Sequence, residues 1–193
     1  KVSTQTYIVK SDIKTVSLQD CFDGLRVDQE KILKVSFKGS YRGENVTAKR
    51  CKKEKVYKNF LNCVTVCVMM DKKLNVKIFN NGVFQLTGCK TVDHVIDCLD
   101  LFVRHFRDLG CCEFSNKDAL TYYIVSVMRN VDFDVGYKID RKSLGKYVCA
   151  MTEYYVPPMT SGYMGVKIKI PVKSYIRDVA VRKIVYDLNA NEI

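Results

Sequence analysis

The sequence predicts an α+β fold in which an antiparallel sheet carries helices on one of its faces. In residues Cys63–Val68, Val alternates with Cys or Thr, which is the two-residue period of a half-buried strand. Two further runs, Asn75–Phe79 and Val83–Thr87, flank Asn80-Asn81-Gly82. These runs predict a β-hairpin, because an Asn-Gly pair tolerates the positive φ angles of a type I′ turn.

A change of period after this hairpin predicts the helical layer. Between Thr91 and Leu109, apolar residues recur at spacings of three and four, as on an amphipathic helix that ends at Gly110. The order of strand, helix and strand then recurs in Thr121–Asp132, Arg141–Met151 and Gly165–Ile170. Helices on one side of four or more antiparallel strands bury a single sheet face, so the opposite face is available for function.

Local signals predict the remaining elements. Val2–Lys10 is rich in β-branched residues, and Ile32–Phe37 alternates, so both predict strands. Ser17 is a suitable N-cap for a short helix. The glycines and many charges of Lys38–Lys58 indicate a loop or a frayed hairpin.

The composition fits one domain, or two small halves that share a core, since 47% of the 193 residues are apolar. No run approaches 18 apolar residues, and the first residues lack the apolar segment of a signal peptide. We therefore expect a soluble intracellular protein that does not interact with membranes. Nine scattered cysteines, an odd number, favour reduced thiols over a disulfide framework.

The net charge of +11 is concentrated in two segments. Lys38–Lys58 has eight basic residues against Glu44 and Glu54, and Tyr163–Lys183 has six against Asp178. Concentrated positive charge favours a polyanion as the partner, most often a nucleic acid. A lysine-rich loop that only keeps the protein in solution is the alternative.

The parity of the hairpin predicts which side chains face away from the helix. Four apolar residues share one parity and are expected under the helix: Val76, Ile78, Phe84 and Leu86. The other parity carries Asn75, Lys77, Phe79, Gln85 and Thr87. Small polar groups, one aromatic ring and nearby lysines suit a nucleic-acid surface. The alternative is a solvated face from which Phe79 folds back onto the core.

Residues 76–90, with the sequence VKIFNNGVFQLTGCK, resemble the signature of the TATA-box-binding protein family. In that signature, a strand ending in Phe, a Gly turn and a strand ending in Thr-Gly lead to a long helix. Residues 2–6 and 12–18 resemble the first strand and first helix of the same repeat. The Asn-Asn-Gly turn and the basic insertion at 38–58 are most similar to homologues from giant DNA viruses.

This resemblance implies a saddle of two pseudo-symmetric repeats, at 1–115 and 116–193, with the second incomplete and carrying an insertion from about residue 171. A curved antiparallel sheet would bind and bend A·T-rich promoter DNA through its minor groove. Helices on the convex face would recruit a B-type initiation factor and RNA polymerase. The expected location is the nucleus or, for a viral protein, the cytoplasmic virus factory or the virion.

The resemblance also implies roles for individual residues. The residues expected to wedge between base pairs are Phe60, Phe79 and Tyr163. The base-contacting positions are Val2, Gln85 and Thr87. Phosphate contacts are expected from Lys77, Lys90, Lys167 and Lys169. The partner-binding helix face comprises Asp93, Asp97, Asp100, Arg104 and Arg107.

Four departures from the family pattern accompany these assignments. Gln85 replaces a usual Val, and Tyr163 replaces a Phe. Two extra residues between Phe60 and Phe79 predict a bulge. No second hairpin and long helix follow Ile170, so we expect that the sequence stops short of the natural C-terminus or that divergence removed this part.

No pattern in the sequence indicates a catalytic or metal site. His94 and Cys98 have the four-residue spacing of paired zinc ligands, and Cys111-Cys112 follows, but no second ligand pair has a compatible spacing. We expect a protein that is not an enzyme and takes no metal, cofactor or small-molecule ligand. Two alternatives to DNA binding are a protein-interaction module that has lost DNA binding and an RNA-binding sheet.

Overall fold

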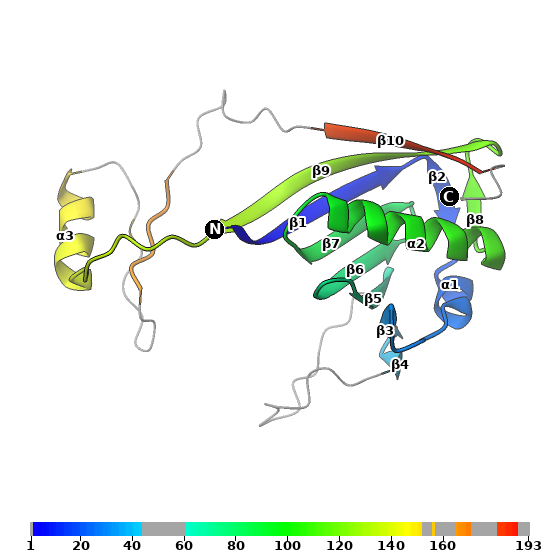
Figure 1. Ribbon diagram of the computed structural model, residues 1–193, viewed down its shortest axis with the longest axis horizontal. Helices are drawn as coiled ribbons and strands as arrows, with labels where there is room; N and C mark the ends of the chain where they lie inside the picture. Colours follow the sequence, from blue (N-terminus) through cyan, green and yellow to red (C-terminus); the bar gives the residue numbers. More distant parts are fainter. Residues whose placement is uncertain (1, 44–60, 152–155, 157–164, 171–180, 189–193) are drawn as a thin grey trace. The chain divides into compact units, whose positions relative to one another are not determined.

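The computed structural model describes residues 2–43, 61–151, 156, 165–170 and 181–188. The chain forms two compact units, which are described separately. Unit 1 comprises Lys1–Asp132 and Ala180–Ile193, and unit 2 comprises Phe133–Val179. In the described ranges, unit 1 has two helices and an eight-stranded antiparallel sheet, and unit 2 has one helix (Figure 1). The predicted α+β class with a large antiparallel sheet is therefore confirmed.

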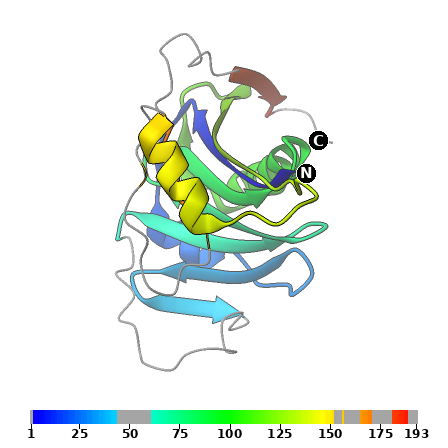
Figure 2. The ribbon, with the colours of Figure 1, turned by 90° about the vertical axis from the view of Figure 1, so that its left-hand side faces the viewer.

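The sheet of unit 1 has the strand order β10-β9-β1-β7-β6-β5-β3-β4, and every neighbouring pair is antiparallel. Figure 2 shows these strands stacked from β10 at the top to β4 at the bottom. Their bounds are β1 (Val2–Ser11), β3 (Ile32–Phe37), β4 (Ser40–Gly43), β5 (Cys63–Met69), β6 (Lys73–Phe79), β7 (Val83–Cys89), β9 (Ala119–Val131) and β10 (Val181–Asp187). A separate two-stranded sheet pairs β2 (Ile13–Val16) with β8 (Cys112–Phe114).

One predicted strand is absent from the described residues. Gly165–Ile170 is irregular except for a single bridge at Lys169, and its last four residues are exposed. A strand needs a continuous hydrogen-bonded ladder with a neighbour, and one bridge does not supply it. The predicted strand at 165–170 is therefore wrong.

The core of unit 1 lies between the sheet and its two helices, α1 (Leu18–Gly24) and α2 (Asp93–Leu109). The predicted apolar stripe of α2 is buried, and the four core-parity residues of the β6–β7 hairpin are fully buried with it. The ring centroid of Phe84 lies 5.9 Å from that of Phe106 and 5.8 Å from that of Tyr122. This packing holds α2 against one face of the sheet (Figure 1).

Both ends of α1 are capped. Ser17 is the N-cap, as predicted, and its hydroxyl accepts a hydrogen bond from the Asp20 backbone N–H. At the other end, the Arg42 guanidinium donates to the carbonyls of Phe22, Asp23 and Leu25, the last two at 3.1 and 3.0 Å. A cation near the C-terminus of a helix is also favoured by the helix dipole. Arg42, which belongs to the basic segment, therefore stabilises the end of α1.

The start of the basic segment forms a tight hairpin. Lys38 and Gly39 both have positive φ angles, of 46° and 88°, and join β3 to β4 as a two-residue turn. The first six residues of the predicted loop or frayed hairpin therefore belong to a regular hairpin. Residues 44–58 of this segment lie outside the described residues.

The turn of the β6–β7 hairpin differs from the predicted type I′ turn. Gly82 has a φ of 70°, but Asn81 is not among the residues with positive φ, which a type I′ turn would require. The Gly82 N–H donates to the Phe79 carbonyl at 3.2 Å. The loop thus has three residues, with the left-handed residue last, because Gly82 alone supplies the positive φ.

In unit 2, the predicted helix is confirmed as α3 (Arg141–Met151). Asp140 precedes it and caps its first turn, since its side chain accepts a hydrogen bond from the Ser143 N–H at 2.6 Å. Hydrogen bonds from Ser143 lower the pKa of the Asp140 carboxyl. In the described ranges, no helix is both long and apolar enough to cross a membrane.

Gly82→Ala is expected to destabilise the protein by about 3 kcal/mol, more than Gly110→Ala, which is expected to cost about 1 kcal/mol. Both glycines have left-handed φ angles, but a Cβ at Gly82 would lie 2.7 Å from the Ile13 carbonyl oxygen, whereas one at Gly110 meets no atom within 4 Å. Urea unfolding of both variants measures the difference. Equal losses would contradict the close approach at Gly82.

Candidate nucleic-acid interface

The sheet face opposite α1 and α2 is called here the open face. Directly paired residues in an antiparallel sheet point to the same side, so the register defines rows across it. The central row runs across seven strands through Ser36, Thr65, Lys77, Gln85, Ile8, Val125 and Val181. Gln85 lies in the middle of this row, between Lys77 and Ile8.

Two further rows flank the central row. One contains Lys34, Cys67, Asn75, Thr87, Thr6 and Met128. On the other side, Lys10 pairs with Val83 and Tyr123, Tyr123 pairs with Lys183, and Cys63 pairs with Phe79. Four residues predicted as DNA contacts, Phe79, Gln85, Thr87 and Lys77, therefore lie together on one face.

Phe79 does not fold back onto the core. Its side chain is half-buried, but it belongs neither to the buried core nor to the partly buried apolar residues packed against that core. Its ladder partner Cys63 is 2% exposed. The sequence left two positions open for this ring, and the structure places it on the open face.

The open face is more apolar than the hairpin alone predicts. β1, β9 and β10 contribute Ile8, Val125, Tyr123 and Val181, and Tyr123 is 41% exposed. In β9, Leu120, Tyr122 and Ile124 are buried while the residues between them face the other side. Both parities of this strand are apolar or aromatic, so alternation in polarity could not separate its faces.

The other predicted contacts are not assembled with these residues. Val2 is half-buried and pairs with Val131, beyond the part of β1 that pairs with β7, which begins at Gln5. Lys167 and Lys169 are exposed in unit 2. Phe60 and Tyr163 lie outside the described residues.

Lys90 follows β7 and is held in an ion pair. Its Nζ lies 3.3 Å from Oδ2 of Asp71, and Nε2 of His94 lies 3.1 Å from Oδ1 of the same carboxylate. The Lys90 carbonyl accepts a hydrogen bond from Gln5, which is 4% exposed and itself accepts from Arg129. The predicted phosphate-contacting lysine therefore already has an anionic partner.

The predicted partner-binding helix face divides into two parts. Asp93, Asp97, Arg104 and Arg107 are exposed on α2. Asp100 is half-buried and accepts a hydrogen bond from the Tyr186 hydroxyl of β10. Burial and this hydrogen bond raise the pKa of Tyr186. Asp100 thus joins α2 to the edge strand.

A cluster of three thiols lies where α1 meets β8. Cys111 Sγ is 3.9 Å from Cys112 Sγ, and Cys111 also exchanges a hydrogen bond with Cys21. Hydrogen bonding with Cys112 and Cys21 lowers the pKa of the Cys111 thiol, and hydrogen bonding with Cys111 raises the pKa of the other two thiols. The described cysteines are all unpaired thiols.

His94 and Cys98 do not form the metal-ligand pair that their spacing allows. Cys98 is fully buried in the core, whereas His94 contacts Asp71. In the part of the chain that the structure describes, no group of three or more His, Cys, Asp or Glu side chains is arranged to hold a metal ion.

Comparison with known proteins found two viral relatives. The chain is 30% identical over 162 residues to the TATA-box-binding protein-like protein of Acanthamoeba polyphaga mimivirus, covering 69% of this chain and 44% of that protein. It is 36% identical over 91 residues to the uncharacterized protein 335L of Invertebrate iridescent virus 6, covering 46% of this chain and 26% of that protein. No family model matches the chain. The chain thus spans less than half the length of both relatives.

Replacing two aromatic residues of one hairpin tests the two faces. Phe84→Ala is expected to cost about 3–5 kcal/mol because it empties a fully buried site, whereas Phe79→Ala is expected to cost about 1 kcal/mol. Urea unfolding of both variants provides the measurement. A loss at Phe79 as large as that at Phe84 would place this ring in the core.

Proposed function

We propose that this chain is a divergent viral member of the TATA-box-binding protein family and binds duplex promoter DNA through the open face of unit 1. The single observation that carries the proposal is the register, which gathers Phe79, Gln85, Thr87 and Lys77 on that face. The similarity to the mimivirus protein supports the family assignment. The large antiparallel sheet is compatible with a saddle.

The residue types on the open face suit a minor groove. Thr65, Thr87 and Ile8 are small or aliphatic and allow a close approach to the sugars and base edges. Phe79 lies near the turn, where a ring can enter a base step and bend the duplex. Lys77 lies within the face, and Lys10 lies in a flanking row, where ammonium groups can contact phosphates.

We assign base preference to Gln85. Its amide occupies the centre of the central row, where bound DNA would remove it from water. Desolvation of an amide is costly unless a base edge supplies a hydrogen bond. The minor groove offers acceptors at A·T pairs and an added amino donor at G·C pairs, and an amide can bond to either.

The remaining parts of the proposal come from the family resemblance. The exposed residues of α2, namely Asp93, Asp97, Arg104 and Arg107, would contact a B-type initiation factor and RNA polymerase. The repeats at 1–115 and 116–193 remain predictions. We propose a role that is not enzymatic, in an intracellular viral context, without a cofactor.

A second candidate function is a protein-interaction module without DNA binding. The ion pair between Lys90 and Asp71 favours it, because this lysine is not presented to a phosphate. In that case α2 would keep its partner role while the open face bound no duplex.

Phe79→Ala is expected to weaken binding to an A·T-rich duplex about tenfold or more, which corresponds to ~1.4 kcal/mol. Phe79→Leu should retain most of the affinity, since Leu also serves as an apolar wedge. Gel-shift titration of both variants provides the measurement. Unchanged affinity in Phe79→Ala would remove the wedge role, and a wild-type protein that shifts no duplex would favour the interaction module.

The absence of Trp from the chain allows a direct probe of the face. Phe79→Trp places a single Trp on the open face, and Phe114→Trp places one on β8, where Phe114 packs against the core; each Trp can be excited without exciting Tyr. Duplex DNA is expected to change the emission of the first variant and leave the second unchanged. A response to single-stranded RNA with none to duplex DNA would identify an RNA-binding sheet instead.

A further inference from the structure

The ammonium group of Lys90, which the family resemblance assigns to a phosphate contact, forms an ion pair with the carboxylate of Asp71. We propose that Asp71 competes with the DNA backbone for Lys90, so that binding requires exchange of the Asp71 carboxylate for a phosphate. This inference rests on the proposed function. It makes Asp71 a determinant of affinity that opposes binding equally at all sequences.

Three separate segments bring the participating groups together. Asp71 lies in the turn between β5 and β6, Lys90 follows β7, and His94 lies in the first turn of α2. Each carboxylate oxygen of Asp71 has one partner, Lys90 Nζ at 3.3 Å and His94 Nε2 at 3.1 Å. A phosphate group presents oxygens to the same kinds of donor.

The hydrogen bonds assign a proton to the histidine. The Lys90 backbone N–H donates to His94 Nδ1 at 3.4 Å, so Nδ1 is the acceptor and Nε2 carries the proton that faces Asp71. The His94 side chain is only 14% exposed, which holds this donor in place. An anion is therefore bound by one ammonium group and one fixed N–H donor.

Asp71 and Lys90 lie at one end of the strands that form the open face. The β5–β6 turn joins the strands that carry Cys67 and Asn75, and the row of these residues continues to Thr87, three residues before Lys90. Lys72 follows Asp71 in the same turn, and Lys73 is the first residue of β6. Asp71 thus supplies negative charge at a basic end of the sheet.

The strength of the ion pair permits exchange. The side chains of Lys90 and Asp71 are 47% and 51% exposed, and solvent-exposed pairs contribute little to stability. A phosphate contact also releases condensed counterions from the DNA, which adds a salt-dependent gain. After the exchange, the carboxylate of Asp71 remains near the duplex and repels its phosphates. Because a phosphate contact reads no base, the effect should not depend on sequence.

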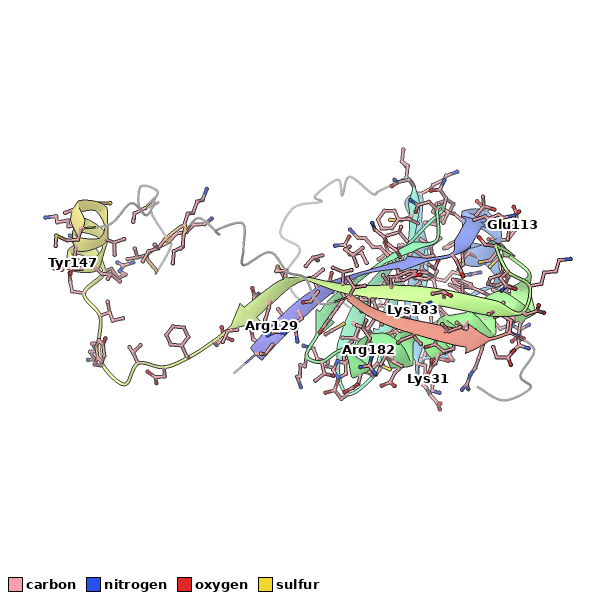
Figure 3. The ribbon with its side chains drawn as sticks, turned by 90° about the horizontal axis from the view of Figure 1, so that it is seen from above. Lys31, Glu113, Arg129, Tyr147, Arg182 and Lys183 are labelled. Carbon is pink, nitrogen blue, oxygen red and sulfur yellow. The ribbon has the colours of Figure 1, made fainter. Side chains whose placement is uncertain are left out.

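The chain offers a matched control pair in Lys14 and Glu113. Their Nζ and Oε1 atoms are 3.1 Å apart, and both side chains are similarly exposed, at 56% and 59%. The pair joins β2 to β8 outside the eight-stranded sheet. Figure 3 shows Glu113 and Arg129 at opposite ends of unit 1, and Arg129 is at the Lys90 end because both bind Gln5.

Asp71→Asn and Glu113→Gln each raise the net charge by one and break one exposed lysine pair. The amide oxygen that Asp71→Asn introduces can still accept a hydrogen bond from His94 Nε2, so the main difference between the variants is the position of the lost charge. Asp71→Asn is expected to raise affinity about threefold to tenfold for both A·T-rich and G·C-rich duplexes. It should also steepen the slope of log K against log salt by about one. Glu113→Gln is expected to change affinity by less than about twofold. Thermal unfolding of each variant checks that the fold is retained.

Lys90→Gln in the Asp71→Asn background should remove the gain in affinity, because the double variant has no ammonium group at this position to contact a phosphate. Equal affinities and slopes for Asp71→Asn and Glu113→Gln would overturn the inference. If the wild-type protein binds duplex DNA and Phe79→Ala weakens it while Asp71→Asn has no effect, the inference alone fails. If neither the wild-type protein nor any variant binds duplex DNA at low salt, the proposed function fails and the inference with it.

Discussion

The packing of α2 against one face of the sheet determines what the other face can do. Ile78 pairs with Phe84 beneath the helix, and the adjacent pair of Lys77 and Gln85 is thereby turned to the opposite side. A slip of one residue in this register would exchange the two sets. Gly82 fixes the register through its left-handed turn, and the Ser11 hydroxyl holds it by donating to its carbonyl at 2.5 Å. The candidate interface therefore depends on core packing more than on any residue of its own.

Positive charge in this protein is divided between folding and surface electrostatics. Arg42 is used to cap α1, and Lys90 is paired with Asp71, although both contribute to the net charge of +11. Total charge therefore overstates the cations that a polyanion would meet. Whether a cation contributes to binding depends on the anions beside it in the fold. Because screening limits electrostatic interactions to short distances, a carboxylate competes with a phosphate only for the cations next to it.

Elements with local signals were predictable, and contacts between distant segments were not. The period of α2, the cap at Ser17 and the alternation of β6 and β7 are properties of neighbouring residues, so they could be read from the sequence. The turn type at Asn81 was predicted wrongly because Asn tolerates positive φ without requiring it. Pairing of β1 with β9, and of Asp71 with Lys90, depends on tertiary structure. Ile8 and Val125 were missed for that reason.

The connection between β9 and β10 has a consequence for the order of folding. These strands are neighbours in the sheet, yet Val125 and its partner Val181 enclose residues 126–180, whereas Ile78 and Phe84 enclose only the turn of their hairpin. The chain entropy lost on closing the longer loop exceeds that of the shorter one by about 2 kcal/mol. β10 should therefore join the sheet after β6 and β7 have paired, and leave it first under denaturing stress. The hydrogen bond from Tyr186 of β10 to Asp100 of α2 would then form last. The final folding step would therefore join the C-terminal strand to the central helix.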